Sequence, residues 1–123
     1  MLVLADTSIW VDHLRTGNTL LVELLDQGKI LMHPSVLGEL ALGNLKNRSE
    51  ILQFLNKLPE ADVATDEEVL QAIENKRLWG QGIGWIDAHL LASTLLTSSC
   101  ALWTLDAALR KIAFRAGAAF SSG

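Results

Sequence analysis

The sequence contains little of what usually stabilises a small secreted domain. Its 123 residues include one cysteine, two prolines and no tyrosine. A single thiol, Cys100, excludes an internal disulfide, and its position among apolar neighbours is typical of a reduced, cytoplasmic protein. A chain of this length hides roughly two-thirds of its unfolded surface on folding without such cross-links. We therefore expect a single domain over residues 1–123.

The sequence also lacks an uninterrupted apolar segment long enough to cross a membrane. The stretch 78–105 carries few charges, but glycines near its start and several polar side chains interrupt it. At the amino terminus, Asp6 and Asp12 break the apolar run before a signal-peptide core can form, and no basic segment precedes them. We expect neither a membrane span nor a secretion signal.

Short apolar runs alternate with longer amphipathic ones along the chain. This alternation is typical of an α/β fold built on a mostly parallel sheet. The strands are expected at residues 2–5, 30–32, 62–64, 101–104 and 118–120. The helices are expected at residues 9–15, 19–27, 34–45, 50–58, 66–79, 85–97 and 107–116.

Four carboxylates stand alone within segments that are otherwise apolar. Asp6 directly follows the first predicted strand, and Asp106 comes just after the strand predicted near the carboxyl end of the chain. Glu39 is the sole charged residue of its predicted helix, and Asp87 lies in the first turn of a later apolar helix. An unpaired buried carboxylate costs several kcal/mol, and no lysine or arginine is interleaved with these four. Their isolation therefore calls for a ligand or for dedicated hydrogen bonds.

The expected fold brings these acids together. The carboxyl ends of parallel strands and the starts of the following helices converge on one crevice, where such folds bind ligands. Carboxylates without a histidine or cysteine ligand pattern suit Mg²⁺ or Mn²⁺ rather than zinc. One or two such ions can activate a water, hold a phosphate and neutralise the leaving oxygen. The four acids thus indicate metal-dependent phosphoryl chemistry.

Each acid taken alone also has a purely structural interpretation. Asp6 can cap a helix, and Glu39 can lie on an exposed helix face. Asp87 can be favoured by the positive end of its helix, and Asp106 can pair with Arg110 one turn later. The four together favour the metal site over coincidence.

Four motifs are spread along the whole chain, and their order and spacing are specific. They are Asp6-Thr7-Ser8, the segment 34–43 with Glu39, Gly82-Ile83-Gly84-Trp85-Ile86-Asp87-Ala88-His89, and Leu102-Trp103-Thr104-Leu105-Asp106. On these residues the chain resembles the PIN-domain nucleases, and among them the VapC-type toxins of bacterial type II toxin–antitoxin pairs. The resemblance implies a three-layer α/β/α sandwich around a mostly parallel sheet of about four to five strands.

The resemblance further implies an endoribonuclease that depends on Mg²⁺ or Mn²⁺. Its catalytic residues are Asp6, Glu39, Asp87 and Asp106, of which Asp6, Asp87 and Asp106 hold the metal, while Ser8 and Thr104 supply supporting hydroxyl hydrogen bonds. Members of the family are usually homodimers, each inhibited by a small VapB-type antitoxin. Their substrates are structured RNAs such as a tRNA or a ribosomal RNA loop, and cleavage inhibits translation.

A net charge of −4 is unusual for a protein that binds RNA. Subtracting the four clustered acids from the 14 acidic residues leaves 10, against 10 lysines and arginines, so the remaining surface is balanced. The candidate phosphate contacts are Arg15, Lys46, Arg48, Lys76 and Arg77. Each of them can equally be a solvated surface charge.

Several other features favour structural roles. The glycines between residues 80 and 84 follow a helix rather than a strand, which excludes a dinucleotide-binding fingerprint. His89 lies two residues after Asp87 and can approach the edge of the groove. The four tryptophans are more typical of a core or a dimer interface than of base stacking, although one can line the groove.

Two alternative functions stay open on the sequence. A metal-dependent phosphatase of the haloacid-dehalogenase type also places an aspartate after its first strand, but it needs a second one where Ser8 stands. A PIN fold acting as an RNA- or protein-binding module without catalysis is the other, and the presence of all four carboxylates argues against it.

Overall fold

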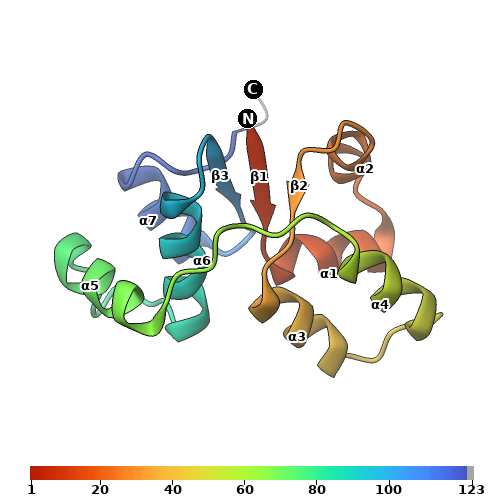
Figure 1. Ribbon diagram of the computed structural model, residues 1–123, viewed down its shortest axis with the longest axis horizontal. Coiled ribbons are helices and arrows are strands. Elements are labelled where there is room, and N and C mark those ends of the chain that lie inside the picture. Colours follow the sequence, from red (N-terminus) through yellow and green to blue (C-terminus); the bar gives the residue numbers. More distant parts are fainter. Residues whose placement is uncertain (122–123) are drawn as a thin grey trace.

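The computed structural model describes residues 1–121, which form three strands and seven helices (Figure 1). The strands are β1 (Leu2–Ala5), β2 (Ile30–Leu31) and β3 (Cys100–Trp103). The helices are α1 (Thr7–Thr16), α2 (Thr19–Asp26), α3 (Pro34–Leu42), α4 (Arg48–Asn56), α5 (Asp66–Lys76), α6 (Trp85–Leu96) and α7 (Ala107–Arg115). The chain therefore has the expected α/β composition.

The three strands form a parallel sheet in the order β2-β1-β3. Single bridges extend it at both edges, because Met32 pairs with Glu60 beside β2 and Leu102 pairs with Ala119 beside β3. The mostly parallel sheet is thus confirmed. The outer strand predicted at 118–120 is present only as the bridge at Ala119, and the bridge beside β2 lies at Glu60, before the predicted strand at 62–64.

The strand expected at residues 62–64 does not form there, because its backbone bonds to a helix instead. The N–H of Asp62 donates to Thr97 Oγ1 over 2.9 Å, and that of Ala64 donates to Ser93 Oγ over 3.0 Å. Ser93 lies within α6, and Thr97 caps the carboxyl end of this helix. These side chains accept the amide hydrogens that a strand would direct to its neighbour.

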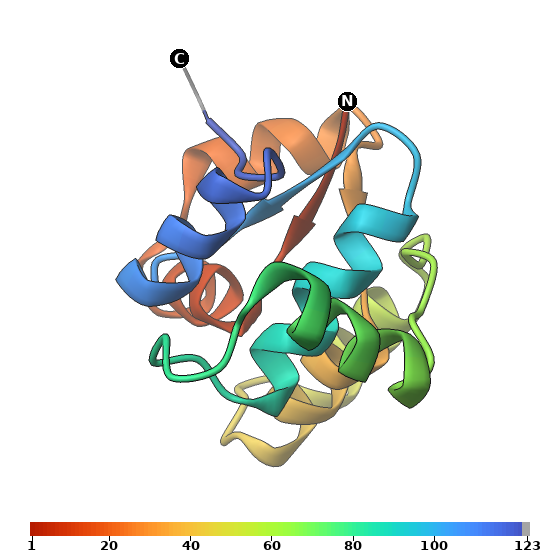
Figure 2. The ribbon, with the colours of Figure 1, turned by 90° about the vertical axis from the view of Figure 1, so that its left-hand side faces the viewer.

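Helices cover both faces of the sheet. Figure 2 shows α2 and α7 to one side of the strands and α6 to the other, with α5 outside α6. The core between these layers contains Leu4, Ile9, Leu91 and Leu102, each at most 1% exposed. The structure is the α/β/α arrangement expected from the sequence. Among residues 1–121, no helix is long and apolar enough to cross a membrane.

The direction of the strands places three helix starts on one edge of the sheet. In Figure 1 all three arrows point the same way, and α1, α3 and α7 follow β1, β2 and β3 in the chain. The cap of α1 is Asp6, whose side chain accepts the N–H of Ile9, and the cap of α7 is Asp106. Two of the four isolated acids are therefore helix caps at the carboxyl edge of the sheet.

Candidate functional site

A cavity of about 200 Å³ opens at this edge of the sheet. It is lined by Asp6, Thr7, Ser8, Glu39, Asp87, Leu90 and Asp106. All four isolated carboxylates of the sequence thus meet in one cavity, although they come from four different segments of the chain. No lysine or arginine is among its lining residues.

Asp6 is the buried acid of the group, with 5% of its surface exposed. Its Oδ1 accepts the N–H of Ile9 over 3.3 Å and the hydroxyl of Ser8, and its Oδ2 accepts the hydroxyl of Thr104. Donors to both oxygens compensate for the loss of water around the charge. The hydroxyls of Ser8 and Thr104 therefore both donate to the Asp6 carboxylate.

The same hydroxyls hold the chain around Asp106. Ser8 Oγ accepts the N–H of Leu105 over 2.9 Å, and Thr104 Oγ1 accepts the N–H of Asp106 over 3.0 Å. Asp106 itself accepts the N–H of Leu109 over 2.8 Å and so caps α7. Arg110 donates to the carbonyl of Leu105 over 3.3 Å, so the alternative pairing of Arg110 with Asp106 is not what positions this acid.

The remaining acids lie nearer to solvent than their apolar sequence neighbourhood suggests. Glu39 is exposed and accepts the hydroxyl of Thr7 over 2.7 Å, and Asp87 is half-buried with the N–H of Gly84 at 3.4 Å from its Oδ2. The apolar residues around Glu39 are not all core, since Leu42 is 90% exposed. Only at Asp6 does isolation in the sequence correspond to full burial.

The four carboxylates act on one another electrostatically. Burial raises the pKa of Asp87, the hydrogen bond from Gly84 opposes that rise, and the charges of Asp106, Asp6 and Glu39 add to it. Every other acid of the cavity thus disfavours the ionised form of Asp87. The cavity is a concentration of negative charge that a cation would relieve.

The donor atoms of the cavity suit a hard cation. They are carboxylate and hydroxyl oxygens, with no nitrogen or sulfur ligand, and such sets favour Mg²⁺ or Mn²⁺. Within residues 1–121, however, no three acidic, histidine or cysteine side chains are already gathered as a metal-binding group. Each carboxylate is instead turned toward its own donor, which is Thr104 for Asp6, Thr7 for Glu39 and Leu109 for Asp106.

Two of the five candidate basic residues lie beside the acids. Arg15 and Lys46 line a wider groove of about 580 Å³, which shares Glu39 with the acidic cavity. Its other walls are mostly apolar and come from α1, α3, α4 and the loop between α3 and α4; they include Val11, Leu14, Leu40 and Ile51. The structure therefore joins a basic and apolar groove to the rim of the acidic cavity.

The other three basic residues have different surroundings. Arg48 donates to the carbonyls of Gly43 and Ala41, so its guanidinium closes the carboxyl end of α3. Lys76 and Arg77 lie at the end of α5, where Arg77 adopts φ 53° and terminates the helix. This turn ends α5 earlier than the expected residue 79.

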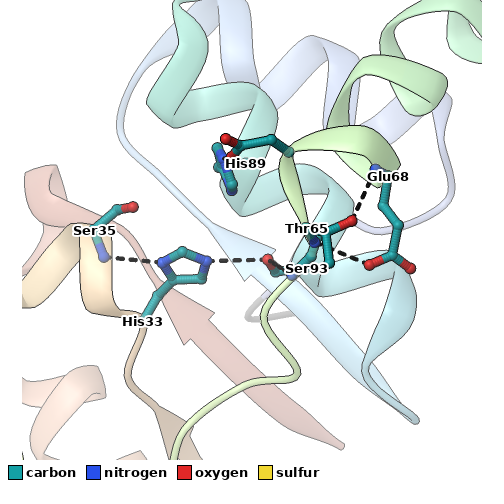
Figure 3. A network of polar contacts seen from close by, with 8 residues as sticks. His33, Ser35, Thr65, Glu68, His89 and Ser93 are labelled. Atoms are coloured by element: carbon teal, nitrogen blue, oxygen red, sulfur yellow. Dashed lines mark hydrogen bonds and ion pairs between the residues drawn. The ribbon is translucent and has the colours of Figure 1, made fainter.

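A buried polar network that the sequence pattern does not reveal connects several elements of the fold. Figure 3 shows His33 between the backbone of Ser35 and the hydroxyl of Ser93, 60 residues away in the sequence. The only local signal was a histidine directly before the proline that begins α3. His89 does not line the acidic cavity, because its Nε2 lies 3.0 Å from Asp66 and its ring packs against Trp85.

Comparison with known proteins agrees with this architecture. Residues 3–115 match the PIN domain family. The chain is 42% identical over 120 residues to the proteins named Ribonuclease VapC32 from Mycobacterium tuberculosis strains CDC 1551 / Oshkosh and H37Rv. Each alignment covers 98% of this chain and 97% of the relative.

Proposed function

This chain belongs to the PIN domain family, and from that premise we propose that it is a ribonuclease of the VapC type, the toxin of a toxin–antitoxin pair. The observation that supports this function best is the convergence of Asp6, Glu39, Asp87 and Asp106 on one cavity. Metal-assisted hydrolysis of a phosphodiester uses divalent cations, which a cluster of carboxylates can hold. The acidic cavity contains such a cluster.

In this proposal Asp6, Asp87 and Asp106 hold Mg²⁺ or Mn²⁺. When bound, the ion supplies Lewis acidity that activates water and neutralises charge on the phosphate. Ser8 and Thr104 keep the Asp6 carboxylate in a fixed orientation through their hydroxyls. Glu39 lies at the rim, steadied by Thr7, and orients the water for in-line attack. The products are a 5′-phosphate and a 3′-hydroxyl, and a 2′,3′-cyclic phosphate end would contradict this route.

The groove beside the cavity is proposed to hold the RNA backbone. Arg15 and Lys46 stand along it next to Glu39, where their charges can contact phosphates on either side of the scissile bond. Lys76 and Arg77 lie at the end of α5 and do not line this groove. We therefore expect them to contribute little to RNA binding. The substrate class is structured RNA, a tRNA or a ribosomal RNA loop, whose cleavage inhibits translation.

The family relationship extends the proposal to partners. We propose that the chain forms a homodimer and that a VapB-type antitoxin inhibits it in the cytoplasm. The similarity to Ribonuclease VapC32 supports the assignment to the VapC type, from which these partners follow as a proposal. Co-purification with the product of a short adjacent reading frame tests it directly.

Cleavage of total cellular RNA by purified, antitoxin-free protein tests the catalytic proposal. Wild type is compared with Asp87→Asn and with Asp62→Asn, an exposed aspartate outside the cavity, in Mg²⁺, Mn²⁺ or EDTA. We expect discrete fragments from wild type and Asp62→Asn with either ion, and none with EDTA or with Asp87→Asn. Cleavage that persists in EDTA or in Asp87→Asn would overturn the metal-dependent mechanism.

A further inference from the structure

A buried polar node at His33 and Ser93 joins three segments of the chain. His33 is 1% exposed and Ser93 is 0% exposed. His33 Nδ1 accepts the N–H of Ser35 over 3.0 Å, and His33 Nε2 lies 3.0 Å from Ser93 Oγ. Ser93 Oγ also accepts the N–H of Ala64 over 3.0 Å. The start of α3, the middle of α6 and the segment before α5 therefore meet at one hydroxyl.

The partners determine the direction of each hydrogen bond. The backbone N–H of Ser35 can only donate, so His33 Nδ1 carries no proton. The neutral ring consequently bears its hydrogen on Nε2 and donates it to Ser93 Oγ. The two lone pairs of that oxygen then accept from His33 and from Ala64. A side chain that replaces either residue must reproduce this polarity to keep the node intact.

The node connects the two helices that carry Glu39 and Asp87. Glu39 follows His33 by six residues in α3, and Asp87 precedes Ser93 by six residues in α6, a rise of about 9 Å along each helix. Helix α3 packs mainly against α1 and α4, whereas α6 packs mainly against α5 and β3. The hydrogen bond of His33 to Ser93 thus adds a direct polar link between two helices whose main packing partners differ.

We propose that His33 and Ser93 form a positioning pair, which fixes α3 against α6 and thereby sets the separation of Glu39 and Asp87. The inference rests on the proposed ribonuclease function, because it gives the pair its consequence. Neither residue touches the cavity, so both act through the helices. A shift of about 1 Å in the geometry of reacting groups can slow a reaction about 100-fold. A loosened node should therefore act on catalysis as well as on stability.

Two variants weaken the node in different ways. Ser93→Ala leaves the Nε2 hydrogen of His33 and the N–H of Ala64 without their acceptor. His33→Asn keeps an oxygen that can cap the N–H of Ser35 but is too short to reach Ser93. The matched control is Leu21→Ala, which removes a fully buried side chain from α2, a helix without any cavity residue.

The experiment measures Mn²⁺ affinity, RNA cleavage and unfolding of all these proteins. For Ser93→Ala and His33→Asn we expect kcat to fall about 10-fold to 100-fold with KM little changed, and the Kd for Mn²⁺ to rise about tenfold. The double variant should be no slower than the slower single variant, because the same His33–Ser93 bond is lost in each. Leu21→Ala should lose as much stability while keeping wild-type kcat and Mn²⁺ affinity. If Ser93→Ala does not fold, His33→Asn carries the same expectation.

Other outcomes separate the inference from the function on which it rests. Node variants that cleave RNA and bind Mn²⁺ as well as Leu21→Ala would overturn the positioning pair and leave the ribonuclease function standing. Additive losses in the double variant would also overturn it. A wild-type protein that neither binds Mn²⁺ nor cleaves RNA would remove the proposed function, and the positioning role with it.

Discussion

Thr104 donates its hydroxyl hydrogen bond to Asp6, 98 residues earlier in the chain. The bond joins the end of β3 to the end of β1, since each residue directly follows its strand. Thr104 also accepts the N–H of Asp106 over 3.0 Å. One buried hydroxyl therefore orients one acid of the cavity through its side chain and a second through its backbone.

Replacing Thr104 by valine should impair both stability and activity. The change keeps the shape of the side chain but leaves Asp6 Oδ2 and the N–H of Asp106 without a partner, at an expected loss of about 1–3 kcal/mol. Urea unfolding and RNA cleavage measure the two effects, and we expect cleavage to fall at least about tenfold. Thr94→Val is the control, because the hydroxyl of this similarly buried threonine donates to the carbonyl of Leu90 within α6, away from the acids. Equal activity losses in both variants would refute a specific role for Thr104.

The location of the site could be predicted because it depends on chain direction. Asp6 and Asp106 immediately follow buried parallel strands, so the topology alone brings them to one edge. Asp87 and Glu39 stand out in the sequence as isolated charges within apolar helices and as members of two of the four motifs. The structure places both in the cavity but shows Glu39 exposed, because one face of α3 is open to solvent.

Features that depend on contacts between distant side chains could not be predicted. The segment 62–64 has the composition of a strand, yet Thr97 and Ser93 accept its amide hydrogens. The partner of His33 is likewise fixed only by how α3 and α6 approach each other. Periodicity and strand ends determine which elements meet, whereas side-chain hydrogen bonds across them are set by tertiary packing.

Neutralising Asp87 should stabilise the metal-free protein. The pKa of this carboxyl is raised by burial and by Asp106, Asp6 and Glu39, so the unfolded chain releases its proton at a lower pH than the folded one. Stability is therefore lost as pH rises from the unfolded pKa of about 3.9 to the folded value. We expect Asp87→Asn to melt above wild type at pH 7 without metal, and the difference to vanish at acid pH. Saturating Mg²⁺ or Mn²⁺ should reverse the order, since only wild type keeps the full ligand set.

Calorimetry from pH 3 to pH 8 measures this dependence. Asp6→Asn is an instructive contrast, because three donors point at the Asp6 carboxylate and an amide nitrogen cannot accept from them. That substitution should therefore stabilise the protein less than Asp87→Asn. A lower melting temperature for Asp87→Asn in metal-free buffer would show that repulsion within the cavity is not a net destabilising force.

His33 should make the protein sensitive to mild acid. Burial lowers the pKa of this imidazole from its ordinary value of 6.5 to about 4, and repulsion from His89 adds to the effect. The unfolded chain therefore binds a proton below pH 6.5 that the folded protein does not bind until about pH 4, and stability falls as pH decreases through this window. The expected loss is roughly 3 kcal/mol. Urea titrations of wild type and His33→Asn isolate this contribution by difference, and equal slopes between pH 6.5 and pH 4 would contradict it.

Removing the basic charges beside Glu39 should weaken RNA binding without slowing the bound reaction. Arg15 and Lys46 line the groove that shares Glu39 with the acidic cavity, whereas Lys76 lies at the far end of α5. Each phosphate contact releases a counterion, so Arg15→Gln or Lys46→Gln should reduce the slope of log affinity against log salt by about one. KM should rise while kcat stays within about twofold, because these side chains hold substrate and transition state alike.

Lys76→Gln is the control and should match wild type in both KM and the salt dependence of RNA binding. An equal effect at Lys76 would mean that the RNA follows general surface charge, and that the groove beside Glu39 does not direct it to the acids.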